Sequence, residues 1–99
     1  MKNIVAICEN LQSAEAIKLA GKELGINVVC EIQENCKIQN EISEAEIRKA
    51  CAVLFVISFE VEDIEKIERF IDCEYYEVEP KYVINDAKSV IKEIMEEIN

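Results

Sequence analysis

The amino-acid sequence predicts an α/β fold built on a parallel β-sheet. Short runs rich in Ile and Val alternate with segments of helical period, and this strand-then-helix order repeats along the whole chain. Of the 99 residues, 51% are apolar, whereas only two are Gly and one is Pro, a composition typical of a compact domain. Because a chain of this length supports one hydrophobic core, we expect residues 1–99 to form a single domain.

The first half of the chain contains two expected strands and a helix between them. Residues 2–8 form the first Ile- and Val-rich run, and Asn10 is a suitable N-cap for the helix that follows. Gly25 is a typical signal for the end of that helix. Residues 27–33, with the sequence NVVCEIQ, then predict a second strand.

The central part of the chain predicts a helix followed by a buried strand. After a polar loop, Ser43 and Glu46 have the spacing of a capping box, and the helix is expected to run to about Ala50. Residues 52–57 are apolar at every position, which is typical of a central parallel strand covered on both faces.

The last third of the chain predicts a short helix, a short strand and a longer helix. Residues 61–70 are expected to lie on the sheet as a short helix, and residues 75–78 to form a fourth strand. Pro80 is expected in the loop before the last helix, where it interrupts no hydrogen-bond pattern. The apolar side chains of that helix recur on one face, at Ala87, Val90, Ile91, Ile94, Met95 and Ile98.

Four successive β–α units predict a four-stranded parallel sheet in the order 2-1-3-4, with helices on both faces. This is a three-layer sandwich of the Rossmann-like or flavodoxin-like kind, since the crossovers must be short and right-handed. Ligands of such sheets bind outside the carboxyl ends of the strands, where the strand order reverses. We therefore expect residues 8–12 to lie beside residues 58–61, with residues 34–40 close by.

The net charge excludes several classes of partner. Twenty-one acidic residues against 11 basic ones give a net charge of −10. Nucleic acids and anionic lipids are bound chiefly through Lys and Arg, so neither is expected as a partner. No segment has the roughly 20 apolar residues of a membrane span, and the N-terminus does not resemble a signal peptide. We therefore expect a cytoplasmic domain that does not insert into a membrane.

Cys8 is the residue of this sequence for which a chemical reaction can be written. It ends the first strand and precedes the turn that opens the first helix, where unpaired N–H groups and the helix dipole stabilise a thiolate. The same amides suit a phosphoryl group bound to the sulfur. Glu9 and Glu15 flank the site, and no Lys, Arg, His or Gly lies between Cys8 and Glu15.

The cysteine pattern indicates reduced thiols and no metal. The five cysteines are odd in number and form no CxxC pair, and the chain has no His, so a zinc site is not expected. The first turn has no glycine, which disfavours a flavin or dinucleotide, and no cofactor is expected. Cys36 lies in the loop after the second strand, and a redox pair of Cys36 with Cys8 is an alternative that depends on the distance between them.

Several pieces of the sequence, taken in order, resemble a known family. They are EIQE at residues 31–34, NEIS at 40–43, ACAVL at 50–54 and ERF at 68–70. These pieces, and the helix sequence before them, are similar in order and spacing to the cytoplasmic IIB domain of the fructose-specific bacterial sugar phosphotransferase system (PTS). There the corresponding pieces are a strand ending ETQG, a G-x-x-N-x-L-T loop, an ADAVI-type strand and a segment ending ERF. The resemblance covers nearly the whole chain and implies one IIB-like domain over residues 1–99.

The resemblance also implies a reaction. In this family the loop after the first strand reads CPTGIAHT, and its cysteine takes a phosphoryl group from a phosphohistidine of the IIA domain and passes it to a sugar held by the membrane IIC domain. Cys8 matches that cysteine. The resemblance therefore implies a phosphotransferase with IIA and IIC partners, Cys8 as the catalytic residue, and a phosphate-binding loop made of Glu9, Asn10, Leu11, Gln12 and Ser13.

The loop also differs from the family's pattern, and this leaves an alternative open. The Pro, Gly and His of the family's loop are missing here, and the connection to the helix is several residues shorter. In the second loop, Glu34 and Lys37 stand where the family has Gly. A Gly-poor loop with carboxylates is a poorer anion cradle. The alternative is a phosphotransfer-inactive regulatory or protein-binding module in which Cys8 is simply a small apolar residue.

Overall fold

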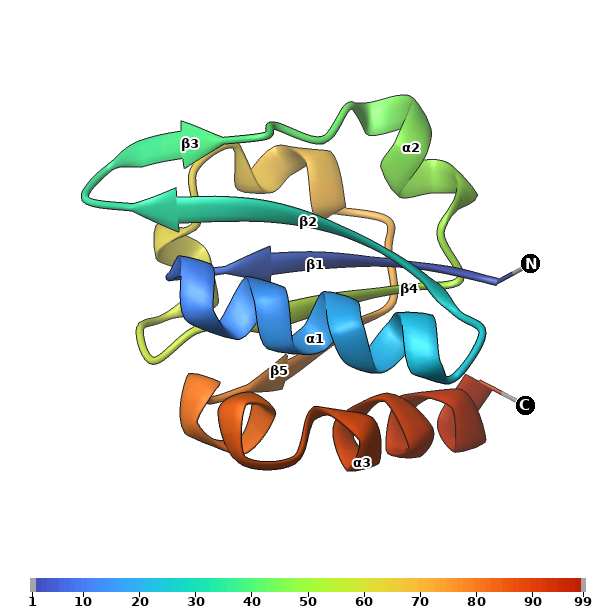
Figure 1. Cartoon of the computed structure of the whole chain (residues 1–99). Helices are drawn as coiled ribbons and strands as arrows, with labels where there is room; N and C mark the ends of the chain where they lie inside the picture. Colours follow the sequence, from blue (N-terminus) through green and yellow to red (C-terminus); the bar gives the residue numbers. More distant parts are fainter. Residues whose placement is uncertain (1, 99) are drawn as a thin grey trace.

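The computed structural model describes residues 2–98, which form a β-sheet with helices on both faces (Figure 1). The strands are β1 (Asn3–Cys8), β2 (Asn27–Glu34), β3 (Lys37–Gln39), β4 (Ala52–Val56) and β5 (Tyr75–Val78). The helices are α1 (Leu11–Glu23), α2 (Glu44–Lys49) and α3 (Pro80–Ile98), together with two short 3₁₀ helices, η1 (Val61–Asp63) and η2 (Ile67–Phe70).

The expected four-stranded, wholly parallel sheet in the order 2-1-3-4 is wrong. The sheet has five strands in the order β3-β2-β1-β4-β5, and β3 runs antiparallel to β2 at one edge. The strand was missed because the turn between β2 and β3 consists of only Asn35 and Cys36, both with positive φ, at 54° and 62°. A two-residue hairpin turn needs this conformation, and its usual sequence signal is Asn-Gly rather than Asn-Cys. The remaining neighbours in the sheet pair in parallel.

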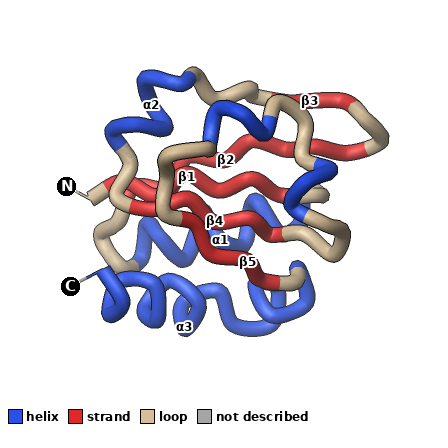
Figure 2. Tube along the Cα trace, turned by 180° about the vertical axis from the view of Figure 1, so that it is seen from behind, coloured by secondary structure: helices blue, strands red, loops and turns tan. Residues whose placement is uncertain are grey.

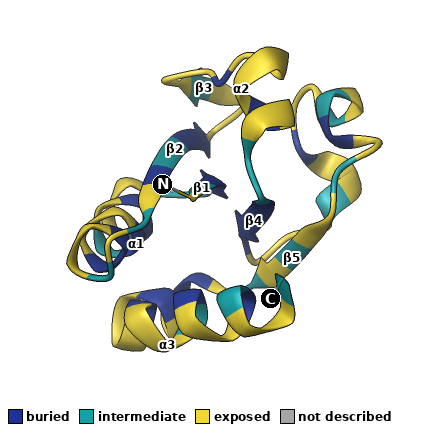
Figure 3. Ribbon diagram, turned by 90° about the vertical axis from the view of Figure 1, so that its right-hand side faces the viewer, coloured by how far each residue is buried: buried dark blue, intermediate teal, exposed yellow. Residues whose placement is uncertain are grey.

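The two faces of the sheet carry separate hydrophobic cores. Helices α1 and α3 pack over one face, whereas α2, η1 and η2 cover the other (Figures 1 and 2). Alternation along β1 divides its side chains between them, so that Ile4, Ala6 and Cys8 face α1 and α3 while Val5 and Ile7 face the other layer. The central strands β1 and β4 are buried along almost their whole length (Figure 3).

Helix α1 begins and ends at the predicted residues. Asn10 is extended and its side chain accepts a hydrogen bond from the Ser13 N–H at 2.8 Å, which is an N-cap. At the other end Gly25 has φ +73°, and the Ile26 N–H returns to the Gly21 carbonyl at 2.8 Å. Gly21 also permits close packing, because a Cβ there would lie 2.4 Å from the Val28 side chain.

The second half of the chain departs from the expected helices in two places. Residues 61–70 form no continuous helix, because Lys66 is left-handed with φ 57° and separates η1 from η2. Pro80 is not in a loop but is the first residue of α3, where a missing N–H costs nothing. Within α3, Asp86 is non-helical (φ −156°, ψ 72°) and accepts hydrogen bonds from Ser89, so a second helical stretch begins after it.

None of the helices in residues 2–98 is long and apolar enough to cross a membrane.

Candidate functional site

The strand register brings the predicted site together at one edge of the sheet. Cys8 pairs with Ile32 of β2 on one side and with Val56 of β4 on the other, so the carboxyl ends of these strands meet there. Strand order reverses at β1, since β2 and β4 lie on opposite sides of it. The first turn of α1 and the residues after β4 extend from the same edge (Figure 1). This is the crevice in which open α/β sheets bind their ligands.

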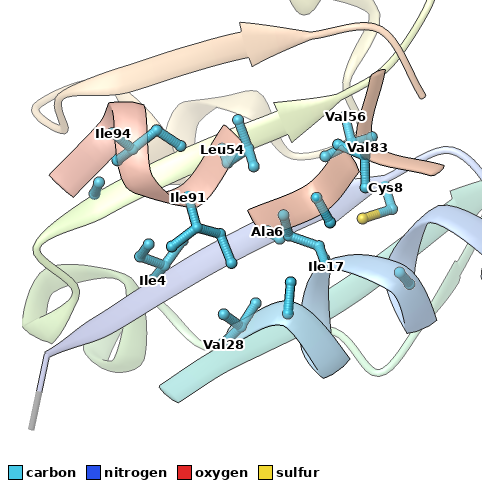
Figure 4. Close-up of a cluster of buried hydrophobic side chains, with 14 of the residues drawn as sticks. Ile4, Ala6, Cys8, Ile17, Val28, Leu54, Val56, Val83, Ile91 and Ile94 are labelled. Carbon is cyan, nitrogen blue, oxygen red and sulfur yellow. The ribbon is translucent and has the colours of Figure 1, made fainter. Parts of the chain in front are cut away.

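Cys8 lies inside the core beneath this edge. Its exposed fraction is 0%, and it belongs to the buried cluster that also contains Val56 of β4 and Val83 in the first turn of α3 (Figure 4). Cys8 thus lies at the expected carboxyl end of β1, but its side chain is buried beneath α1 and α3 rather than exposed at the edge of the sheet. A reagent or phosphoryl group reaches this sulfur only when the residues above it move.

The thiol that contacts Cys8 is Cys30 of β2, a residue that no motif in the sequence singled out. The two are diagonal neighbours on one face, since Cys30 pairs with Ala6 while Cys8 pairs with Ile32. A hydrogen bond to the Cys30 sulfur, together with burial, raises the pKa of Cys8, whereas the Ser13 hydroxyl acts in the opposite direction. The same contact lowers the pKa of Cys30 against the effect of its own burial. In this closed arrangement Cys8 is a protonated thiol.

The start of α1 supplies the donors that an anion would need. Within residues 2–98, the backbone N–H groups of Asn10, Leu11 and Gln12 have no hydrogen-bond acceptor. Ser13 is fully buried, and its hydroxyl donates to the Asn10 side chain at 2.8 Å. The side chains of Leu11 and Gln12 are exposed. Of the predicted phosphate-binding residues, Asn10 and Ser13 therefore place their side chains in the turn that opens α1. Leu11 and Gln12 contribute only backbone N–H groups to this turn, because their side chains are exposed.

Glu9 is bound to the other side of the crevice. Its carboxylate accepts hydrogen bonds from the backbone N–H and from the hydroxyl of Ser58, the latter at 2.8 Å, and its own N–H donates to the Val56 carbonyl at 3.1 Å. Glu9 and Ser58 thus join the turn after β1 to the residues after β4. The Glu9 carboxylate therefore occupies a backbone N–H donor at the carboxyl edge of the sheet, where a bound anion would be expected.

Cys36 is separate from this group. It is exposed in the turn of the β2–β3 hairpin, and all five cysteines are free. The thiol that contacts Cys8 is Cys30, so the structure offers no support for a pair of Cys8 with Cys36. In the part of the chain that the structure describes, no group of three or more acidic or Cys side chains could hold a metal ion.

A buried ionic network beside the crevice was not anticipated. Glu31 is 0% exposed and forms a bidentate ion pair with Arg69, at 2.8 and 2.9 Å. The Gln33 amide donates to the same carboxylate at 2.7 Å, and the Ile42 N–H does so at 2.8 Å. Burial alone would raise the pKa of Glu31, but the hydrogen bonds from Arg69, Gln33 and Ile42 outweigh it and lower the pKa.

The same network fixes two loops at the carboxyl edge. Arg69 also donates to the Ile42 carbonyl at 2.9 Å and to the Glu65 carbonyl at 3.1 Å, while the Glu65 N–H donates to Gln33 at 2.8 Å. The signal was present in the sequence, because Glu31 and Gln33 belong to EIQE and Arg69 to ERF. These sequence pieces supported the resemblance to the family. The sequence alone, however, does not indicate that Glu31 in the strand and Arg69 in the short helix form an ion pair.

Similarity to known proteins agrees with this arrangement. No family model matches the chain. The PTS system fructose-like EIIB component 1 of Escherichia coli (strain K12) is 30% identical over 104 residues, which cover 98% of this chain and 94% of that protein. The solution structure of the Enzyme IIB subunit of the PTS system from E. coli K12 superposes with a TM-score of 0.86 at 29% identity, covering 98% of this chain and 94% of that one.

A second solved structure gives the same result. A domain of the fructose-specific IIABC component of Borrelia burgdorferi superposes with a TM-score of 0.81 at 27% identity, covering 93% of this chain and 91% of that domain. The fold and the site together define a small α/β domain with a cysteine at the switch point of its sheet. The chain belongs to the fructose-like IIB components of the PTS, a phosphotransferase family. The expected resemblance is confirmed, and with it a role as a IIB phosphocarrier.

Proposed function

We propose that Cys8 is the phosphoryl acceptor of this IIB domain. It would receive the phosphoryl group from a phosphohistidine of a IIA domain and pass it to a sugar bound by a membrane IIC domain. The observation that carries the proposal is the position of Cys8 at the carboxyl end of β1, beside three backbone N–H groups of residues 10–12 that lack an acceptor within residues 2–98. Such amides stabilise charge on a sulfur-bound phosphoryl group.

The reaction requires the turn over Cys8 to open. In the closed form the pKa of Cys8 is raised by the contact with Cys30 and by burial, so the thiol is protonated. Movement of residues 9–12 exposes the sulfur to water, which relieves the effect of burial and accepts the proton. The thiolate then attacks phosphorus in line, the P–N bond of the donor breaks, and the departing imidazole nitrogen takes up a proton.

A second candidate function is favoured by two observations. The sulfur of Cys8 is completely buried, and Glu9 already occupies an amide donor at the crevice. A chain that never opens would be a phosphotransfer-inactive IIB-like module that regulates or binds other proteins. In that case Cys8 contributes only to packing.

Phosphoryl labelling distinguishes the two functions. The purified domain would be incubated with the general phosphoryl-donor proteins of the PTS and a fructose-type IIA domain, and then analysed by intact mass and peptide mapping. We expect one phosphoryl adduct on the peptide that contains Cys8, and none in Cys8→Ser. Cys36→Ser is the matched control and should be labelled like the unaltered chain, since Cys36 lies exposed in the turn of the β2–β3 hairpin.

Two results would contradict the proposal. Labelling that persists in Cys8→Ser would place the phosphoryl group on another residue. A folded domain that stays unlabelled while the donor proteins are active would favour the inactive module.

A further inference from the structure

A groove opens at the carboxyl ends of β4 and β5, on the edge of the sheet where Cys8 of β1 pairs with Val56 of β4. Phe59 and Tyr82 line it, and Ser58, Glu60, Glu77 and Glu79 complete its walls. These residues come from the loop after β4, from β5 and its loop, and from the first turn of α3, which lie together at one edge of the molecule (Figure 1). The groove is therefore built by segments that are distant in sequence.

The groove contains exposed aromatic surface. Phe59 is 39% exposed and Tyr82 is 54% exposed, and Ile84, two residues further on, is 41% exposed. Large apolar side chains that gather at one exposed place are typical of protein-binding surfaces. Aromatic residues in particular act as anchors at the centre of an interface.

This groove adjoins the proposed acceptor. Val83, the residue after Tyr82, belongs to the same buried cluster as Cys8 (Figure 4). Ser58, on the other wall, holds the carboxylate of Glu9. A molecule that occupies the groove thus contacts the first turn of α3 and also Ser58, which binds the turn after β1 through Glu9.

Carboxylates surround the aromatic side chains. Glu60, Glu77 and Glu79 are all exposed, and within residues 2–98 neither Glu60 nor Glu77 forms an ion pair. Lys81 lies 3.5 Å from Glu79 and over the Tyr82 ring, so one of the three charges is compensated. An apolar centre with a negative rim is complementary to an apolar patch edged by Lys and Arg.

We propose that the protein that donates the phosphoryl group docks in this groove, with an apolar patch between Phe59 and Tyr82 and with basic side chains against Glu60 and Glu77. This rests on the proposed function of Cys8, whose position fixes where a donor must bind. The basic rim of the donor would also offset the repulsion between these carboxylates and the phosphoryl group that it carries. Docking on Ser58 and on the start of α3 would act on the Glu9 contact that holds the turn over Cys8, and on a helix that packs over the same face of the sheet.

Binding is tested without phosphoryl transfer. The ¹⁵N-labelled chain would be titrated with an unphosphorylated fructose-type IIA domain, and amide shifts and Kd would be measured at low and at high salt. We expect the largest shifts at residues 58–60, 77–79 and 82. Phe59→Ala and Glu77→Lys should each weaken binding by about tenfold, and only Glu77→Lys should remove most of the salt dependence.

Control variants match these changes elsewhere on the surface. Glu96→Lys reverses an exposed charge near the other end of α3, and Ile71→Ala removes an apolar side chain that is 77% exposed. Both should bind like the unaltered chain, and all four variants should keep the dispersed spectrum of a folded domain.

The outcomes separate this proposal from that for Cys8. Absence of binding, shifts confined to other surfaces, or normal binding by both Phe59→Ala and Glu77→Lys would overturn the docking surface. Such a result would leave the assignment of Cys8 as acceptor unchanged, because that assignment depends only on the labelling experiment. Conversely, binding in the groove by a chain that is never labelled would support the groove and overturn Cys8 as acceptor.

Discussion

Glu9 links the turn after β1 to the residues that follow β4, through hydrogen bonds with Ser58. The contacts comprise two donors of Ser58 and one carboxylate, all within the crevice that would receive a phosphoryl group. Because like charges repel, a dianionic phosphoryl group and this carboxylate would not share the Ser58 amide. If Cys8 is the acceptor, as proposed, release of Glu9 from Ser58 would accompany opening of the site.

Removal of the Glu9 carboxylate should expose Cys8. Glu9→Ala loses the contacts to Ser58, and we expect Cys8 to be alkylated by iodoacetamide about tenfold faster than in the unaltered chain, if opening costs about 1.4 kcal/mol less. Alkylation would be followed by peptide mapping, so that the five cysteines are distinguished. Glu15→Ala, which removes an exposed carboxylate of α1, is the control and should leave the Cys8 rate unchanged. Equal rates in Glu9→Ala and the unaltered chain would show that other contacts keep Cys8 closed.

At the scale of elements, the β2–β3 hairpin is held by an unusual turn. Cys36 adopts a left-handed conformation that glycine adopts more readily, and its side chain is exposed. Cys36→Gly creates the Asn-Gly turn that hairpins prefer and should raise the free energy of unfolding by about 0.5–1 kcal/mol. The gain would be measured by urea denaturation.

The neighbouring position provides the control for that change. Lys37 is the first residue of β3, in extended backbone, so Lys37→Gly should lower the free energy of unfolding by about 0.5–1 kcal/mol. A loss of stability in Cys36→Gly would mean that the thiol side chain makes a contribution larger than the relieved strain.

The ion pair between β2 and η2 should contribute far more than the exposed pairs. Arg69→Met leaves the Glu31 carboxylate buried without its cation, which should cost about 3–5 kcal/mol. Arg48→Met breaks an exposed i,i+4 pair with Glu44 and should cost less than about 1 kcal/mol. Urea denaturation of both variants gives the comparison. Similar losses would indicate that water enters the network around Glu31.

The sequence predicted those elements whose signals are local. The cap at Asn10, the stop at Gly25 and the apolar run of β4 each act within a few residues, and the structure has them as expected. The hairpin and the break at Lys66 depend on left-handed residues that have no glycine to mark them.

The candidate site was predictable only in part, for the same reason. The order of the strands around β1 places Cys8 at the edge, and this follows from crossover rules. Burial of its side chain under α3, its contact with Cys30 and the contact of Glu9 with Ser58 depend on packing between segments 22 to 75 residues apart. No local pattern in the sequence carries that information.

At the scale of the whole molecule, stability should fall on acidification partly through Glu31. Its pKa is lowered in the folded state, so the unfolded chain binds the proton more readily. The stabilisation is complete above the ordinary pKa of a Glu, about 4.3, and is lost as the pH falls through the lower folded pKa. Urea denaturation of the unaltered chain should show this loss below about pH 5.

Two substitutions assign the effect. Glu31→Gln has no carboxyl group to titrate at this position, so its free energy of unfolding should change less between pH 5 and pH 3 than that of the unaltered chain. The slope of the free energy of unfolding against pH should differ by roughly the contribution of one titrating group. Glu44→Gln, at an exposed position, should keep the full dependence. Identical slopes in Glu31→Gln and the unaltered chain would contradict the assignment.

The sheet ends on strands of only three and four residues, β3 and β5. Each edge strand therefore offers few unpaired backbone groups to a strand of another molecule. This limits aggregation through edge-strand pairing, which is a risk for a domain whose central strands are apolar. It also limits how another protein can attach, since recognition by strand addition depends on a long open margin. A partner of this domain must therefore bind mainly to its surface side chains. Single substitutions at the surface can then change the affinity for a partner without changing the fold.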